Sequence, residues 1–317
     1  MNQLQNYNKM MKTTLVGYTG FVGGNLCLSN QFDACYNSKN IEEAFGTQPE
    51  LLVYAGVPAE MFTANNFPEK DLETIENAYN NIVKIQPKQL VLISTISVYP
   101  DLHKGDELTD IHQDSLKAYG ANRLYLEKRV REAYPSALIV RLPALFGHGI
   151  KKNFIFDLIH FIPVLLKTAK YEELFNNTPL ARLYEDRGDG FYKCIASNKE
   201  DRVALKKHFE EAGFSALNFT DSRSRYQFFN LVHLWDLIIK ALDKRIELLT
   251  VTSEPIGVTE LYEHYYHKLF VNEVNNAYPD QNLKSIHAED LGGKDGYIYD
   301  KQQVMIEIIQ FIDSQKE

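Results

Sequence analysis

The chain has 317 residues, 44% of them hydrophobic, so it can bury a large core and is expected to form one or two compact domains. Its formal net charge is −8 and its basic residues are scattered, which excludes the basic stripe that a nucleic-acid-binding protein needs. The three cysteines, Cys27, Cys35 and Cys194, are odd in number and unrelated in spacing. They indicate buried thiols in a reducing compartment rather than a disulfide framework or a zinc site.

The first residues, 1–11, are polar and lack the apolar centre of a signal peptide, so we expect a disordered tail. The longest apolar stretch, which begins at Phe154, is interrupted by Asp157, His160 and Pro163 and cannot span a membrane. These features predict a cytoplasmic protein that contacts neither a membrane nor nucleic acid. They leave a homodimer open.

Short β-type runs alternate with helical patterns in the first half of the chain, which is typical of parallel βαβ units. Strands are expected over 13–18, 32–37, 50–56, 89–95 and 137–142. Helices are expected from Phe21 onward and over 41–45, 69–85 and 116–133. This order predicts an α/β fold with a Rossmann-type, doubly wound parallel sheet, in a dinucleotide-binding domain of residues 12–150.

Beyond Gly149 the pattern changes to longer helical and loop segments. Residues 151–317 are expected to form mainly a smaller substrate lobe, while 226–245 returns to the first domain. The segment 227–242 predicts a strand or turn that runs into a helix. The segment 247–266 predicts a strand followed by a helix that Thr259 could cap.

A glycine-rich loop lies between the first expected strand and helix. Gly17, Gly20 and Gly23 fit G-x-x-G-x-x-G, in which the first glycine permits a tight turn, the second admits a pyrophosphate and the third allows close helix–strand packing. The N–H groups that begin the helix would then face the phosphates. A tight turn without a ligand is the alternative, but the βαβ context favours a dinucleotide. The loop residues Thr19, Phe21 and Val22 are expected to contribute to the same site.

The tip of the second expected strand bears on which dinucleotide binds. About 20 residues after the loop, an acidic side chain normally binds the ribose 2′-hydroxyl of NAD. Here the strand ends in Asn37, Ser38 and Lys39, without a carboxylate. A lysine and two small polar groups could instead hold the 2′-phosphate of NADP. NADP and NAD therefore both stay open, as does a solvated turn.

Further motifs follow in a fixed order. The strand motif Ser94–Tyr99 is followed, twenty-four residues after Thr95, by Tyr119-Gly120-Ala121-Asn122-Arg123. VRLPALFGHG (Val140–Gly149), Asn153 and FFNLVHLWDL (Phe228–Leu237) come next. Together with the glycine loop, these motifs resemble the extended short-chain dehydrogenase/reductase family, in its NAD-dependent epimerase/dehydratase group. The resemblance spans residues 13 to about 260.

The resemblance implies roles for three of these residues. Tyr119 would exchange a proton with a substrate hydroxyl or carbonyl while hydride moves to or from a nicotinamide, and Thr95 would hydrogen-bond the same oxygen. Because free tyrosine has a pKa of about 10, a cation must favour its phenolate. The family has a lysine four residues later, where this chain has Arg123. We expect Arg123 to make Tyr119 acidic and to bind the nicotinamide ribose.

The change from lysine to arginine is not conservative, and it leaves two interpretations. The site can be that of an active NAD(P)-dependent epimerase or reductase with altered pH dependence. Alternatively, the protein can be a non-catalytic NAD(P)-binding sensor, regulatory protein or structural partner with a degenerate site. The helix at 72–85 also has Ile75 where the family has an asparagine. Ile96 and Ser97 stand where the family's 4,6-dehydratases carry an Asp-Glu pair, which disfavours a 4,6-dehydratase.

The resemblance also implies the remaining site residues. The cofactor would be lined in addition by Ala55, Gly56, Ser94, Tyr119, Arg123 and Pro143. A nucleotide-sugar substrate would be bound by Asn153 and by Arg223 and Arg225, whose planar guanidinium groups suit a diphosphate. Solvated loop arginines are the alternative. No metal site is expected, because His148 and His233 lack acidic or cysteine partners at ligand spacing.

Overall fold

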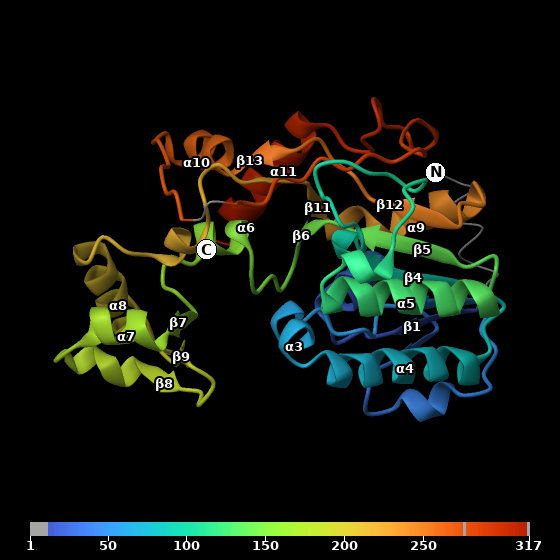
Figure 1. Cartoon of the computed structure of the whole chain (residues 1–317), viewed down its shortest axis with the longest axis horizontal. Coiled ribbons are helices and arrows are strands. Elements are labelled where there is room, and N and C mark those ends of the chain that lie inside the picture. The colour runs from blue at the N-terminus through green and yellow to red at the C-terminus, as the bar shows by residue number, and fades with distance from the viewer. Residues whose placement is uncertain (1–11, 275–276, 316–317) are drawn as a thin grey trace. The chain divides into compact units, whose positions relative to one another are not determined.

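The computed structural model describes residues 12–274 and 277–315, so the tail expected over 1–11 lies outside the described residues. The chain divides into two compact units (Figure 1). Unit 1 contains the described residues up to Ile150 together with Arg225–Ile256 and Pro279–Glu307. Unit 2 contains Lys151–Ser224, Gly257–Tyr278 and the chain from Ile308 onward.

A parallel sheet of six strands forms the centre of unit 1, in the order β12-β5-β4-β3-β1-β2. Its strands are β1 (Thr13–Val16), β2 (Ala34–Tyr36), β3 (Leu51–Tyr54), β4 (Gln89–Thr95), β5 (Leu138–Leu142) and β12 (Leu248–Thr250). The strand order reverses at β1, which has β2 on one side and β3 on the other. Open sheets of this kind bind ligands outside the carboxyl ends of the strands at such a reversal. The predicted Rossmann-type sheet is confirmed.

Helices cover both faces of this sheet because successive strand residues point to opposite sides. The helices are α2 (Phe21–Ser29), α4 (Pro68–Ile85), α5 (Ala118–Ala133) and α9 (Leu234–Asp243). Leu15 and Val53 share a core with α2 and α9, whereas their neighbours Val16 and Leu52 share a core with α4 and α5. Figure 1 shows α4 and α5 lying side by side, and they are in contact. This pairing brings residues of α4 close to the motif that begins α5.

Short elements complete unit 1. One is a short helix, α3 (Met61–Asn66). Two are strand pairs: β6 (Ala144–Phe146) pairs in parallel with β11 (Phe228–Asn230), and β10 (Arg225–Tyr226) pairs with β13 (Ile256–Gly257). The others are single 3₁₀ turns: η1 (Ile41–Ala44), η2 (Ile96–Val98), η3 (Gln113–Ser115), η6 (Leu231–His233) and η7 (Glu289–Leu291). The helix expected over 41–45 is therefore only one 3₁₀ turn. The strand expected to run into a helix over 227–242 is β11 followed by η6 and α9.

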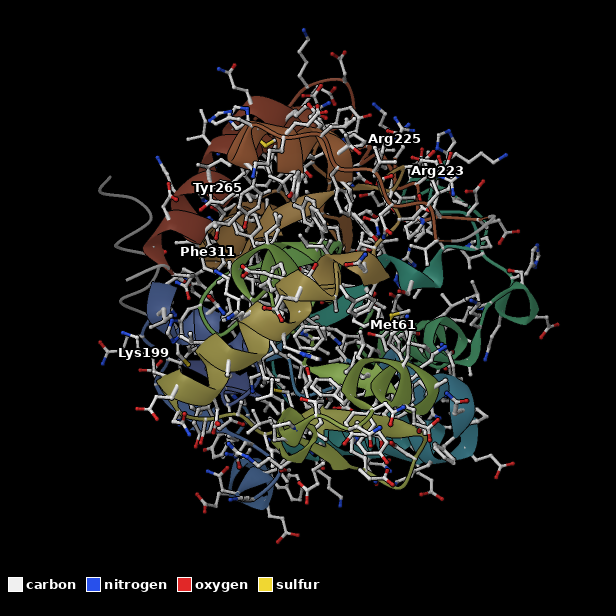
Figure 2. The ribbon with its side chains drawn as sticks, turned by 90° about the vertical axis from the view of Figure 1, so that its left-hand side faces the viewer. Met61, Lys199, Arg223, Arg225, Tyr265 and Phe311 are labelled. Atoms are coloured by element: carbon white, nitrogen blue, oxygen red, sulfur yellow. The ribbon has the colours of Figure 1, made fainter. Side chains whose placement is uncertain are left out.

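Unit 2 has a small antiparallel sheet and an aromatic core. Its elements are β7 (Leu165–Lys167), β8 (Tyr184–Asp186), β9 (Phe191–Cys194), α6 (Phe154–Ile159), α7 (Thr168–Phe175), α8 (Lys199–Glu211), α10 (Val258–Tyr266), η4 (Pro179–Leu183) and η5 (Ala216–Phe219). The sheet order is β7-β9-β8. Phe175, Tyr184 and Phe209 pack together in the core. Lys199, labelled in Figure 2, begins α8. The last helix, α11 (Lys301–Ser314), contributes residues to both units.

Two local predictions differ from the structure. Thr259 does not cap α10, because the helix begins at Val258 and its cap residue is Gly257. The Thr259 hydroxyl instead donates to the carbonyl oxygens of Ser222 and Phe270, at 2.8 and 3.1 Å. The prediction of buried thiols is also wrong, since Cys27 is exposed while Cys35 and Cys194 are half-buried. None of the three forms a disulfide in the structure.

Among residues 12–274 and 277–315, no helix combines the length and apolar character needed to cross a bilayer. Across the same ranges, His, Cys, Asp and Glu side chains do not gather in a group of three or more that could hold a metal ion.

The Asp157 carboxyl in α6 gives unit 2 a pH-dependent stability. Burial raises the pKa of Asp157 from its ordinary 3.8 to about 7. The folded protein therefore keeps a proton that the unfolded chain releases, and the resulting stabilisation is present below about pH 4 and lost as the pH rises through 7. We expect Asp157→Asn to raise the free energy of unfolding at pH 8 by up to about 4 kcal/mol, with little gain at pH 4. Denaturant unfolding at both pH values measures this, and an equal gain at both would contradict it.

Candidate functional site

The predicted cofactor residues of unit 1 lie at one edge of the sheet, where four parallel strands end. Gly17 follows β1, Ala55 and Gly56 follow β3, Thr95 ends β4, and Pro143 follows β5. Because neighbouring parallel strands run in the same direction, their carboxyl ends meet at the same edge. These residues therefore lie along the edge that contains the point at which the strand order reverses.

The three glycines of the loop have different structural reasons to be glycine. Gly17 has φ +96° and a Cβ there would lie 2.5 Å from the Ala55 carbonyl oxygen. A Cβ at Gly23 would lie 2.2 Å from the Gly17 carbonyl oxygen. Gly20 has φ −81°, and its Cβ would lie 3.2 Å from that oxygen, which a small shift can relieve. Packing thus requires glycine at 17 and 23 but hardly at 20, where the free space is available to a ligand. No side chain caps α2 at Gly20, which leaves the first N–H groups of the helix open to an anion.

This difference predicts distinct results for two alanine variants. We expect Gly20→Ala to weaken dinucleotide binding by at least about tenfold while changing the free energy of unfolding by about 1 kcal/mol or less, because the added methyl occupies the space of the pyrophosphate. Gly23→Ala should destabilise the fold, because the helix must move away from the loop. Calorimetric titration with NADP and NAD, combined with denaturant unfolding, separates the two. Unchanged affinity in a folded Gly20→Ala protein would contradict the role of the loop.

The other predicted cofactor residues of this region are placed as follows. Phe21 and Val22 pack on the core below the loop, and Thr19 is exposed beside it. At the tip of β2, the Asn37 N–H donates to Asn40 Oδ1 and the Lys39 N–H donates to Asn37 Oδ1, each at 2.8 Å. These bonds make a tight turn that leaves Ser38 and Lys39 exposed.

Thr95, Tyr119 and Arg123 come together where β4 ends and α5 begins. Thr95 Oγ1 accepts a hydrogen bond from the Ser97 N–H at 3.1 Å. Tyr119 is 6% exposed, and its N–H donates to Asn65 Oδ1 of α3 at 3.0 Å. A Cβ at Gly120 would lie 2.1 Å from the Ser97 carbonyl oxygen, so the missing side chain lets α5 lie directly against the turn after β4. The Arg123 guanidinium carbon lies 4.2 Å from the centre of the Tyr119 ring.

The acidity of Tyr119 differs from the sequence expectation. Burial raises the pKa of Tyr119 above its ordinary 10, and this effect exceeds the opposing influences of Arg123 and Thr95, which favour the phenolate. A carboxylate, Asp71, also contributes to raising this pKa. Arg123 therefore acts in the expected direction, but the expectation of an acidic phenol is wrong for the protein by itself, because desolvation dominates.

Asp71, in the first turn of α4, contacts this cluster and was not singled out from the sequence. Arg123 donates from Nη1 to Asp71 Oδ2 and from Nη2 to the Pro58 carbonyl oxygen, the latter at 2.6 Å. Asn122 Nδ2 donates to the same Asp71 oxygen at 2.9 Å. All three side chains are buried: Asp71 is 9% exposed, Asn122 8% and Arg123 4%. Ile75, one turn further along α4, is fully buried in the core.

Ser94, another predicted cofactor residue, belongs to a buried polar network below the sheet edge. Its hydroxyl donates to Glu127 Oε1 at 2.5 Å, and Arg141 Nη2 donates to Glu127 Oε2 at 2.7 Å. Arg141 also lies over the ring of Tyr99, whose hydroxyl is 2.7 Å from Thr250 Oγ1. The side chains of Arg141 and Glu127 are 5% and 3% exposed. This network ties α5 to β4 and β5 directly behind Thr95.

The three predicted substrate residues are all engaged within their own unit. In unit 2, Asn153 caps α6 by accepting from the Phe156 N–H at 3.2 Å, and its φ of +102° is rare for a residue with a side chain. Arg223, also in unit 2, forms a bidentate pair with Asp221, at 2.9 and 2.8 Å. Arg225, in unit 1, forms another with Asp280, at 2.6 and 2.9 Å. Each guanidinium would have to exchange a carboxylate for a diphosphate in order to bind a nucleotide-sugar.

Comparison with known proteins shows what this part of the chain is similar to. Residues 30–183, just under half of the chain, match the model described as "NAD dependent epimerase/dehydratase family". This stretch is therefore similar to that family. The match includes Thr95, Tyr119, Arg123 and Asn153, and the glycine loop precedes it. The extended short-chain dehydrogenase/reductase resemblance is thereby confirmed.

Solved structures of this epimerase/dehydratase kind share the fold. A dTDP-4-dehydrorhamnose reductase from Bacillus anthracis in complex with NADP aligns with a TM-score of 0.62 at 14% identity, over 96% of this chain and 98% of that chain. The corresponding reductase from Yersinia enterocolitica gives 0.61 at 13% identity, over 96% and 99%. A UDP-N-acetylglucosamine 4-epimerase from Bacillus cereus gives 0.57 at 12% identity, over 97% and 100%. No curated protein matches the sequence significantly.

Proposed function

We propose that this protein is an NAD(P)-dependent epimerase or reductase that acts by reversible hydride transfer on a nucleotide-sugar or a related carbonyl or hydroxyl compound. The observation that carries the proposal is the meeting of Thr95, buried Tyr119 and Arg123 at the sheet edge that also holds the glycine loop. The names of the structural neighbours agree with this class, since they include nucleotide-sugar reductases and an epimerase.

The residues present fit a dinucleotide. The open space at Gly20 and the uncapped start of α2 would hold the pyrophosphate, and Asn37, Ser38 and Lys39 would hold the adenosine ribose. The exposed lysine at this tip suits a 2′-phosphate, and the Bacillus anthracis neighbour is named as a complex with NADP. When bound, the dinucleotide supplies or accepts hydride.

The side chains of this chain would handle the proton. Tyr119 Oη would hold or take up a proton at the substrate oxygen, and Thr95 Oγ1 would hydrogen-bond the same oxygen. Arg123 would stabilise the phenolate when the proton has left. Burial raises the pKa of Tyr119 and so favours the protonated phenol, which can donate a proton when a carbonyl is reduced. Both a reductase and an epimerase include such a step.

The residues after Thr95 argue against a 4,6-dehydratase. Ile96 is 4% exposed and packs in a small core with Val98 and Leu124, so it offers no acid or base to the substrate. Ser97 directs its N–H toward Thr95 and contacts Gly120 through its carbonyl oxygen. Neither position carries a carboxylate that could remove a proton or protonate a leaving hydroxyl.

A second candidate function is a non-catalytic NAD(P)-binding sensor. The observation in its favour is that Asp71 compensates the charge of Arg123, while the pKa of Tyr119 is raised. Mass spectrometry under native conditions would first identify any dinucleotide or nucleotide-sugar that purifies with the protein. Assays with NADPH and dTDP-4-dehydrorhamnose, and with NAD and UDP-N-acetylglucosamine, then separate the functions. Oxidation of NADPH supports the reductase and interconversion of the sugar supports the epimerase, whereas binding without turnover supports the sensor.

A further inference from the structure

We propose that Asp71 is a positioning residue, which fixes the Arg123 guanidinium against the Tyr119 ring and limits the positive charge that reaches the Tyr119 hydroxyl. The proposal deepens the proposed function and rests on it where turnover is concerned. Its structural basis is the buried contact between α4 and α5.

Arg123 is held at two points of its planar group. One terminal nitrogen donates to Asp71 on α4, and the other donates to the Pro58 carbonyl oxygen in the segment that follows β3. Asn122, the preceding residue, donates to Asp71 at 2.9 Å and to the Pro68 carbonyl oxygen at 3.2 Å. Together with the side-chain stem, these two contacts fix the orientation of the guanidinium, whose central carbon lies 4.2 Å from the centre of the Tyr119 ring. Asp71 therefore determines where the cation lies relative to the phenol.

These contacts explain why arginine stands where the family has lysine. A lysine ammonium is a point charge on a flexible stem, whereas the guanidinium presents several N–H donors in a rigid fork. A single guanidinium can bind Asp71 and the Pro58 carbonyl together while its face packs on an aromatic ring. Asp71 and Arg123 are therefore expected to function as a set, in which neither residue can be replaced alone.

The charge of Asp71 acts on Tyr119 in the direction opposite to that of Arg123. The groups that influence the Tyr119 hydroxyl are Arg123 on the same helix, Thr95 at the end of β4 and Asp71 on α4. Arg123 and Thr95 lower the pKa of Tyr119, and Asp71 raises it. Because the pair is buried, solvent screens these interactions only weakly. Removing the carboxylate charge while keeping the shape of residue 71 should leave Arg123 in place and make Tyr119 more acidic.

The test measures the ionisation of Tyr119 directly. Protein labelled with ¹³C at the tyrosine ζ carbon is titrated by NMR from about pH 9 upward, beyond the ordinary tyrosine pKa of about 10, and the resonance missing in Tyr119→Phe is that of Tyr119. We expect Asp71→Asn to move the ionisation midpoint of Tyr119 down by about one pH unit. The limb of the pH–turnover profile that depends on Tyr119 should move in the same direction.

Glu76→Gln is the matched control, because Glu76 also pairs with an arginine across α4 and α5, at 3.4 Å from Arg129, but is about one-third exposed. It should leave the midpoint of Tyr119 unchanged. If Asp71→Asn does not fold, Asp71→Glu keeps the charge and displaces the guanidinium, and its midpoint should lie at or above that of the wild type. A midpoint that Asp71→Asn leaves unchanged or raises, or that Asp71→Glu lowers, would overturn the proposal. Wild-type protein without turnover would refute the proposed function, whereas the NMR result would still decide this inference.

Discussion

Replacing Tyr119 with phenylalanine should lower turnover by about 10²- to 10⁴-fold, which is the usual contribution of a positioned acid or base. The phenyl ring keeps the packing against Arg123 and removes only the hydroxyl that would transfer the proton. The dissociation constants of NADP and NAD should change by no more than a few fold. Steady-state kinetics with the substrate found in the turnover assays, together with calorimetric titration of the cofactor, measure both quantities.

Tyr125→Phe is the appropriate control for this experiment. Tyr125 lies on the same helix, and its hydroxyl donates to Glu76 Oε1 at 2.5 Å, so the variant also removes one hydrogen-bonded hydroxyl from α5. It should retain turnover, because Glu76 and Arg129 do not contribute to the site. A Tyr119→Phe enzyme as active as Tyr125→Phe would exclude the assigned role of Tyr119.

Removing Glu127 should cost about 3–5 kcal/mol of the free energy of unfolding, the effect of breaking a buried ion pair. Glu127 Oε2 is 2.7 Å from Arg141 Nη2, and both side chains are almost completely buried. In Glu127→Ala the Arg141 charge would remain inside the protein without its carboxylate, and the Ser94 hydroxyl would lose its acceptor. Unfolding of the wild type and the variant in guanidinium chloride measures the difference in free energy of unfolding. The m values of the two proteins are compared as well.

Glu76→Ala provides the comparison for Glu127→Ala. Its partner, Arg129, lies at 3.4 Å, and the two side chains are 36% and 33% exposed. Exposed pairs contribute about 1 kcal/mol or less, because water solvates the remaining charge. Similar losses for the two variants would show that burial does not determine the strength of these pairs.

Much of the sheet could be predicted because apolar runs identify strands that are covered on both faces. The range 89–95 equals β4, and the helix expected over 69–85 differs from α4 by one residue. The strand expected over 13–18 ends at Val16, because Gly17 takes a positive φ that turns the chain. The helix expected over 41–45 is a single 3₁₀ turn, since its few residues cannot offset the cost of starting an α-helix.

The candidate site could be predicted only where its residues lie in short motifs. Tyr119 and Arg123 are four residues apart, about one helical turn, so their closeness can be predicted from the sequence. The pairing of Arg123 with Asp71 joins residues 52 positions apart, and an acid in the first turn of a helix is common for electrostatic reasons unrelated to a site. Arg225 shows the same limit, because its partner, Asp280, lies 55 positions further along the chain.

The contact between Gly120 and the Ser97 carbonyl oxygen makes one position decide how far apart the Thr95 and Tyr119 side chains begin. Main-chain atoms, rather than side chains, set how far the start of α5 stands from the end of β4. Substitutions elsewhere along α5 can therefore accumulate without altering this spacing, provided that residue 120 stays glycine.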